Sequence, residues 1–176
     1  MAEWSYKSKS NVEVASGVVS KEDFFKFAQE FKEVMCCVEE RYEIGDLCFG
    51  AFTDGKYVHL KWVAFNKSYI SEIDSNIRLA PDSVYLYDGY TLPDYRGLGL
   101  TTTVLDKTFQ FLKEIGITKT YTLIHHDNFP ILKAKAREKA RKIGTVTYIK
   151  IFNFKTLRLI GETKEDNKKM IQLFSN

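Results

Sequence analysis

The sequence predicts a mixed α/β domain built around one sheet. Three observations favour this class: helix and strand patterns follow one another along the chain, a glycine turn joins a strand to an amphipathic helix, and 176 residues suit one domain. Hydrophobic residues make up 44% of the chain and charged residues 28%, which leaves ample apolar surface for a core. This composition excludes a disordered chain, and no apolar run is long enough to span a membrane.

Changes in the hydrophobic period locate the elements. Ser20 and Asp23 resemble a capping box ahead of apolar residues at helical spacing, and Asp54-Gly55 is typical of a hairpin turn. Residues 66–80 are ambiguous. The expected elements are a helix over roughly 21–35, strands over 47–53, 57–65 and 84–92, a helix over 100–115, a strand over 120–125, a helix over 129–143, strands over 145–152 and 155–160, and a helix over 162–174.

The most informative stretch is the turn Arg96-Gly97-Leu98-Gly99 between a strand and a helix. A helix N-terminus has unpaired N–H groups and a partial positive charge, and glycines let the backbone approach an anion. The arrangement therefore predicts a pyrophosphate cradle, with the hydroxyls of Thr101 and Thr102 just inside the helix. The spacing fits neither a P-loop nor a dinucleotide-binding fingerprint, and a tight turn without a ligand explains the four residues alone equally well.

The segment from Tyr90 to Thr101, Y-T-L-P-D-Y-R-G-L-G-L-T, resembles the signature of the GNAT N-acyltransferase superfamily. That family places P-x-x-R-G-x-G between its fourth strand and the following helix, and the expected order of elements over about 20–160 matches as well. The resemblance implies a single domain over 1–176. Its central sheet would be mostly antiparallel, splayed between strands four and five, and flanked by helices.

The resemblance also implies acetyl-CoA as co-substrate, with no metal. Asn128 would contact the pantetheine arm, and Lys135 stands where the family often has a proton-donating tyrosine, so a charge role toward the coenzyme is preferred for it. Main-chain groups of Gly89, Tyr90 and Thr91 would pair with the same arm. The pyrophosphate would be held by the backbone of Tyr95, Arg96, Gly97, Leu98, Gly99, Leu100 and Thr101.

The activity implied by the resemblance is transfer of an acetyl group to a primary amine, by direct attack in a ternary complex. Candidates for proton transfer are Asp88, Tyr90 and His126, with Asp88 as the leading base because it lies on the strand directly before the motif. Asp88 and Tyr90 are expected on one face of that strand, with Leu86. A solvated strand carboxylate and a surface histidine are the alternative interpretations.

A non-catalytic module that binds or senses acyl-CoA with the same fold is the alternative function, because the family tyrosine is missing. The acceptor surface would come from about 33–46 and 150–156, where Asp46 and neighbouring glutamates suit a cationic amine. Expected partners are a small-molecule or peptide amine acceptor, without nucleic acid or membrane, in a monomer or homodimer, since the net charge is only +3. His59 is interpreted as a core or surface residue.

Cysteine use and the N-terminal residues predict the compartment. The three cysteines are an odd number and have no metal-ligand spacing, so they are expected to be reduced. The first ten residues contain no apolar run of the kind found in secretory signals. The sequence therefore predicts a cytoplasmic protein.

Overall fold

The computed structural model describes residues 14–31, 35–137 and 140–175. The chain forms two compact units: unit 1 comprises 1–65 and 81–122, and unit 2 comprises 66–80 and 123–176. The single domain over 1–176 stays a prediction. No helix in the described part of the chain is long and apolar enough to cross a membrane.

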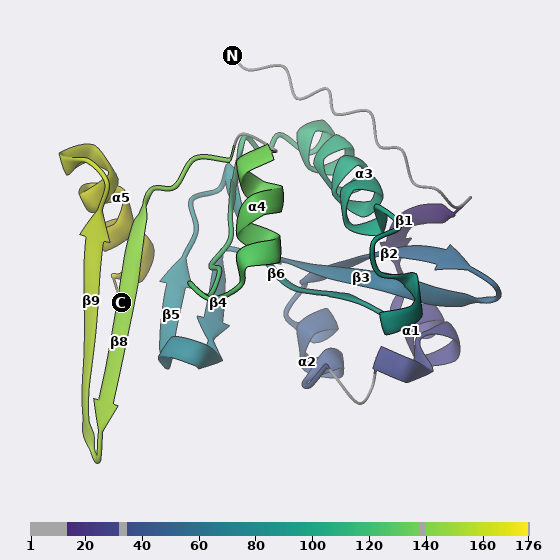
Figure 1. Ribbon diagram of the computed structural model, residues 1–176, viewed down its shortest axis with the longest axis horizontal. Helices are drawn as coiled ribbons and strands as arrows, with labels where there is room; N and C mark the ends of the chain where they lie inside the picture. The colour runs from purple at the N-terminus through teal and green to yellow at the C-terminus, as the bar shows by residue number, and fades with distance from the viewer. Residues whose placement is uncertain (1–13, 32–34, 138–139, 176) are drawn as a thin grey trace. The chain divides into compact units, whose positions relative to one another are not determined.

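Unit 1 is built on a five-stranded sheet in the order β1-β2-β3-β6-β7. β1, β2, β3 and β6 are antiparallel neighbours, and β7 runs parallel to β6. The mixed α/β class and a sheet flanked by helices are thus confirmed (Figure 1). The strands are β1 (Ala15–Val19), β2 (Leu47–Thr53), β3 (Lys56–Phe65), β6 (Ser83–Thr91) and β7 (Lys119–Tyr121).

The first helix is shorter than the predicted helix over 21–35. α1 (Lys21–Phe27) begins as expected, with the Ser20 hydroxyl accepting a hydrogen bond from the Asp23 N–H at 3.0 Å. It ends because Ala28 leaves the helical region, at φ −124° and ψ 39°. A 3₁₀ turn, η1 (Gln29–Phe31), follows, and 32–34 lie outside the described residues.

Two further helices complete unit 1 on opposite faces of its sheet. α3 (Leu100–Glu114) covers one face, where Phe111 packs edge-on against Phe49 of β2, with ring centroids 5.5 Å apart. α1 and α2 (Val38–Glu43) lie on the other face (Figure 1). There Tyr42, directly before the end of α2, packs against Trp62 of β3 at 5.0 Å. The helix over 100–115 is therefore confirmed, and its apolar face closes the core.

The ambiguous stretch 66–80 forms a small hairpin in unit 2. β4 (Lys67–Ile70) and β5 (Ser75–Arg78) pair antiparallel around a 3₁₀ turn, η2 (Ser71–Ile73). Asp74 closes this turn with a left-handed backbone, at φ 45°. Four-residue strands carry too little periodicity to predict a hairpin from the sequence.

The rest of unit 2 confirms the predicted C-terminal hairpin and helix. β8 (Gly144–Ile151) pairs with β9 (Phe154–Gly161), and α5 (Lys164–Phe174) packs on β9 and β5. The Thr163 hydroxyl caps α5 by accepting from the Asp166 N–H at 3.1 Å.

Two further predicted elements are shorter in the structure, a helix of unit 2 and a strand of unit 1. The helix expected over 129–143 is α4 (Phe129–Arg137), since the described residues 140–143 are not helical. Gly144 was expected to end that helix, but it begins β8 instead, where a Cβ would lie 1.9 Å from the Met170 sulfur. The strand expected over 120–125 is reduced to β7, because its parallel pairing with β6 covers only three positions.

Candidate functional site

The glycine turn has the backbone that an anion cradle requires. A 3₁₀ turn, η3 (Pro93–Tyr95), follows β6, and Gly97 and Gly99 have left-handed backbones at φ 79° and 78°. A Cβ on Gly97 would meet nothing within 4 Å, so glycine is favoured there by its backbone angle rather than by space. Gly99 is the N-cap of α3, and no side chain caps this helix.

Free amide groups gather at this turn. The N–H groups of Tyr95 and Arg96 donate within the turn, to Leu92 and Pro93, and those of Thr102 and Thr103 donate to the Gly99 carbonyl. In the described part of the chain, no acceptor is found for the N–H groups between them. These successive donors, with the positive end of α3, suit a diphosphate. They belong to Gly97, Leu98, Gly99, Leu100 and Thr101.

Side chains on both sides of the turn hold it in place. The Tyr95 hydroxyl donates to Asp54 of the β2–β3 turn at 2.9 Å, and this bond raises the pKa of Tyr95. Arg96 folds back onto β6: its Nε donates to the Thr91 carbonyl at 3.2 Å, and its guanidinium lies 5.5 Å from the centre of the Tyr90 ring. The glycine turn is therefore anchored to the β2–β3 turn and to β6.

β6 carries a bulge at the residues expected to meet the acyl group. Trp62 pairs with Tyr87 and Leu60 with Tyr90, so two residues of β6 stand opposite one residue of β3. Asp88, the first of the two, has φ 43°. The prediction that Asp88 and Tyr90 share a face with Leu86 is wrong, because the extra residue breaks the alternation.

Beyond Tyr85, no described strand pairs with β6 on the side of β7. The parallel pairing joins Ser83–Tyr85 to Lys119–Tyr121, and β6 continues to Thr91. Residues 86–91, all described, therefore present an edge on which an extended chain could lie. Gly89, Tyr90 and Thr91 lie on this part of β6.

An ion pair joins the bulge to α2. Arg41 Nη2 donates to Asp88 Oδ2 at 2.6 Å, and its guanidinium lies 5.0 Å from the centre of the Tyr87 ring and 5.2 Å from that of Trp62. Burial lowers the pKa of Arg41, but the nearby Tyr87 and Asp88 outweigh it and raise that pKa. The leading base candidate is thus a paired carboxylate.

A buried carboxylate, Asp46, lies next to this ion pair. The Tyr87 hydroxyl donates to Asp46 at 2.6 Å, and Asp46 is only 4% exposed. Burial raises the pKa of Asp46, against the opposing effects of Tyr87 and Arg41. Burial and the bond to Asp46 also raise the pKa of Tyr87. Asp46 is therefore a core acid and does not belong to an exposed acceptor surface, contrary to expectation.

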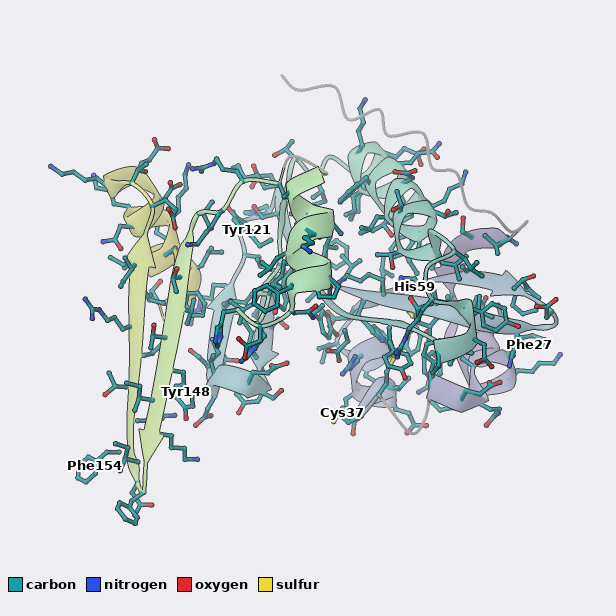
Figure 2. The ribbon with its side chains drawn as sticks, in the orientation of Figure 1. Phe27, Cys37, His59, Tyr121, Tyr148 and Phe154 are labelled. Carbon is teal, nitrogen blue, oxygen red and sulfur yellow. The ribbon has the colours of Figure 1, made fainter. Side chains whose placement is uncertain are left out.

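His59 of β3 lies opposite Thr91 of β6, and Figure 2 shows it among the strands of unit 1. It is 1% exposed, and its Nδ1 shares a hydrogen bond of 2.7 Å with the Thr91 hydroxyl. Burial, and to a lesser degree Lys61, lowers the pKa of His59 to about 3. The ring is therefore neutral at physiological pH, and its interpretation as a core residue is confirmed.

The remaining predicted site residues belong to unit 2. The Asn128 side chain accepts from the Ile131 N–H at 3.4 Å and so caps α4, while Lys135 is half-buried on that helix. His126 is exposed and lies 2.8 Å from Asp127. Unit 1 brings together the glycine turn, Gly89–Thr91 and Asp88. Contributions of the unit 2 residues to the same site stay predictions.

A group of three side chains in unit 2 carries metal-ligating atoms. His125, His126 and Asp127 place one such atom each within 4.8 Å of the others, and all three are exposed. Exposed groups of this kind are common without an ion, so the arrangement by itself does not indicate a metal site.

Two shallow depressions in unit 1 do not include the glycine turn. One, of about 220 Å³, lies between α3 and the β1–β2 edge. The other, of about 240 Å³, has an apolar floor and an acidic rim. It belongs to the predicted acceptor region 33–46, of which 33 and 34 lie outside the described residues. Its lining residues are Phe24, Phe25, Met35, Cys37, Val38, Glu39 and Glu40.

No motif or periodicity in the sequence points to Arg41. Its partner Asp88 is 47 residues away, so no local spacing connects them. The hairpin signal at Asp54-Gly55 placed β2 and β3 correctly, but the bulge that turns Asp88 toward α2 leaves no mark in the residue pattern. An arginine in a short helix of otherwise acidic character is the only hint, and it indicates a solvated ion pair equally well.

Comparisons with known proteins give a family and a fold. A sequence model described as the acetyltransferase (GNAT) family matches residues 21–137. A structure of AAC(6')-Iy in complex with the bisubstrate analogue CoA-S-monomethyl-acetylneamine superposes with a TM-score of 0.60 at 15% identity, over 80% of this chain and 99% of that one. A comparison with curated protein sequences finds no match.

Two further solved structures have the same fold. Aminoglycoside antibiotic 6'-N-acetyltransferase AAC(6')-Ih from Acinetobacter baumannii has a TM-score of 0.59 at 15% identity, covering 79% of this chain and 98% of that one. Aminoglycoside acetyltransferase meta-AAC0020 from an uncultured soil metagenomic sample, in complex with trehalose, has a TM-score of 0.53 at 13% identity, covering 80% of this chain and 95% of that one. At such identities the likeness concerns the fold.

Proposed function

The chain belongs to the acetyltransferase (GNAT) family, and from this premise we propose that it transfers an acetyl group from acetyl-CoA to a primary amine of a small-molecule acceptor. The observation that carries the proposal is the run of free amide groups from Gly97 to Thr101 at the start of α3. A diphosphate on these donors satisfies the first turn of a helix that no side chain caps.

The unpaired edge of β6 is the proposed binding site for the pantetheine arm of the coenzyme. Main-chain groups of Gly89, Tyr90 and Thr91 lie on the stretch of β6 that β7 leaves unpaired. An extended pantetheine arm can hydrogen-bond there as an added strand would. Asn128 and Lys135 of unit 2 are further proposed coenzyme contacts.

Bound acetyl-CoA would supply an activated acyl carbonyl and a thiolate leaving group. The protein's tasks are to position the amine, stabilise the oxygen that gains charge, and accept a proton. Backbone N–H groups at the β6 bulge are the proposed donors to that oxygen. The amine attacks directly, so a carbon–nitrogen bond forms as the carbon–sulfur bond breaks, and no residue carries the acetyl group.

Asp88 is the proposed general base: it would bind the amine and accept its proton. It lies at the bulge, and its side chain is 41% exposed. Tyr90 is half-buried: its ring lies next to the Arg96 guanidinium, and its centroid is 6.0 Å from that of Phe31. We propose that its hydroxyl protonates the thiolate. His126 stays a candidate for relaying the proton to solvent.

One pair of measurements tests this function. Saturating acetyl-CoA should raise the melting temperature of the protein in a thermal-shift assay. The protein should then release free thiol from acetyl-CoA when a pool of amines is added. Pools should contain sugar amines, aminoglycosides, amino acids, polyamines and peptide N-termini. Absence of stabilisation at saturating acetyl-CoA contradicts the proposal. Stabilisation without thiol release from any pool would instead support the non-catalytic acyl-CoA-binding module.

A further inference from the structure

Arg41 is a buried cation whose guanidinium meets β6 at the bulge. The residue is 9% exposed, and a charge is costly to bury unless it is paired. Its Nη2 donates to Asp88 Oδ2 at 2.6 Å and also lies 4.0 Å from the Cys36 sulfur. Among the described residues, Asp88 supplies the one carboxylate in contact with this guanidinium. The position therefore serves the contact with Asp88.

Packing leaves the guanidinium little freedom to move away from Asp88. It lies over the rings of Trp62 and Tyr87, at 5.2 and 5.0 Å from their centres. Nη1 is buried and has no partner in the described part of the chain, so the short bond from Nη2 to Asp88 and the long contact of Nη2 with Cys36 hold the far end of the side chain. The aromatic rings set its plane and the carboxylate sets its direction.

The backbone of Asp88 needs such support. A left-handed backbone at a residue other than glycine is strained, and it persists only where neighbouring groups hold it. Asp88 has φ 43°, in a bulge that turns both Tyr87 and Asp88 toward α2. The bond from Arg41 holds this conformation at the strand where the acyl group is proposed to lie.

The pair leaves one oxygen of the carboxylate available. Arg41 takes Oδ2, and the described residues offer Oδ1 no partner. The Asp88 side chain is 41% exposed although that of Arg41 is only 11% exposed. The carboxylate thus has one oxygen bound by Arg41 and another without a partner among the described residues.

We propose that Arg41 is a positioning residue for acyl transfer: it holds the Asp88 carboxylate at the β6 bulge so that Oδ1 accepts a hydrogen bond from the incoming amine. The inference rests on the proposed function. Arg41 itself makes and breaks no bond with the substrates. Its effect is to fix the direction from which the amine nitrogen meets the acyl carbon.

Substitution of Arg41 tests this role. Arg41→Met keeps the apolar stem on Trp62 and removes the charge, and we expect kcat to fall about a hundredfold, as for a misplaced reacting group. KM for acetyl-CoA should stay within about twofold, because the glycine turn is untouched. Arg41→Lys should recover part of kcat, since it restores the cation without the planar fork.

A double-mutant cycle of Arg41 and Asp88 shows whether Arg41 positions Asp88 or only stabilises the fold. Asp88→Asn should lower kcat by itself, and adding Arg41→Met to Asp88→Asn should lower it further by less than about threefold, since contacting residues are non-additive. Losses that multiply would show that Arg41 acts independently of Asp88, and would overturn the inference. If Arg41→Met fails to fold by circular dichroism, the same cycle is run with Arg41→Lys.

A matched control variant, and measurement of wild-type turnover before that of the variants, distinguish a failure of the role of Arg41 from a failure of the proposed function. Lys119→Met removes an ion pair of 2.8 Å with Asp82, just before the other end of β6, and should leave kcat unchanged. The acceptor used in all these assays is the amine that the wild-type chain acetylates best among sisomicin, spermidine, glucosamine and lysine. Without wild-type turnover on any of them or on any amine of the pools above, both proposals fail. With wild-type turnover, an unchanged kcat in folded Arg41→Met overturns only the role of Arg41.

Discussion

Two antiparallel hairpins of this chain have similar sequence patterns and opposite surroundings. In the β2–β3 hairpin of unit 1, apolar residues such as Phe49, Leu60 and Trp62 are at most 1% exposed. In the β8–β9 hairpin of unit 2, Phe152 is 90% exposed and Phe154 83% exposed, and Figure 2 shows Phe154 at the end of the hairpin. Aromatic residues in a strand pattern therefore predict the strand but not its burial.

The difference comes from what covers each hairpin. β2 and β3 have strand partners on both sides and helices on both faces, α3 on one and α1 with α2 on the other. β8 and β9 pair with each other and pack against α5. Buried strands can hold charged and titratable groups in fixed positions, as β3 and β6 hold His59 and Asp88.

Removal of a covered aromatic residue should have the largest effect. Trp62→Ala takes away a fully buried ring that packs on Phe24, Tyr42 and Tyr87. We expect the free energy of unfolding to fall by about 3–5 kcal/mol. Urea denaturation followed by circular dichroism measures it. A loss below about 1 kcal/mol would show that this hairpin is not the packed core described here.

The second prediction concerns a covered histidine. His59 has a pKa of about 3 when folded, so below its unfolded pKa the unfolded state binds more protons, and stability falls as pH drops. Between pH 7 and pH 5 this contribution is about 2 kcal/mol, from an unfolded pKa of about 6.5. Denaturation of the wild type and His59→Gln across this range measures the difference in slope.

An exposed histidine of unit 2 is the control for that measurement. His126 has a side chain that is 83% exposed, and His126→Gln should leave the pH dependence of unfolding unchanged. Equal slopes for the wild type and His59→Gln would contradict the buried, neutral state of His59.

Loss of a buried hydroxyl should have a smaller effect. Tyr87→Phe removes the donor to Asp46 and leaves a 4% exposed carboxyl without that bond. We expect unfolding to become easier by about 1–2 kcal/mol, the cost of an unsatisfied buried group. Chemical denaturation near pH 7 measures the loss. Unchanged stability would mean that Asp46 finds another donor.

The smallest effect is expected in the uncovered hairpin. Phe154→Ala removes a ring that is 83% exposed, and stability should stay within about 0.5 kcal/mol of the wild type. The same denaturation assay applies. A loss comparable to that of Trp62→Ala would show that the β8–β9 hairpin is covered in solution, and the contrast between the two hairpins would disappear.

Sequence patterns located the elements that have long periodic signals. The helix over 100–115 and both hairpins with a clear turn follow from local periodicity. β1 and the β4–β5 hairpin were not predicted, because strands of four or five residues contain too few alternations. The predicted helix over 129–143 is too long because Gly144, which close packing on Met170 requires, resembles a helix end in the sequence.

The candidate site divides in the same way. The glycine turn was predictable, because positive φ and free N–H groups follow from glycines at a strand-to-helix junction. The pairing of Arg41 with Asp88 was not, because it depends on a bulge and on a contact across 47 residues. The burial of Asp46 is not predictable for the same reason, because its partner Tyr87 comes from a distant part of the sequence.

Binding of acetyl-CoA to the wild type and to Gly97→Val tests the central claim most directly, by isothermal titration calorimetry. Gly97 has φ 79°, which a β-branched residue adopts only with strain, while the space around it is open, so the variant should fold. We predict binding to the wild type and an affinity at least about tenfold weaker in Gly97→Val. Equal affinity in the two proteins, or no binding to either, would contradict the account.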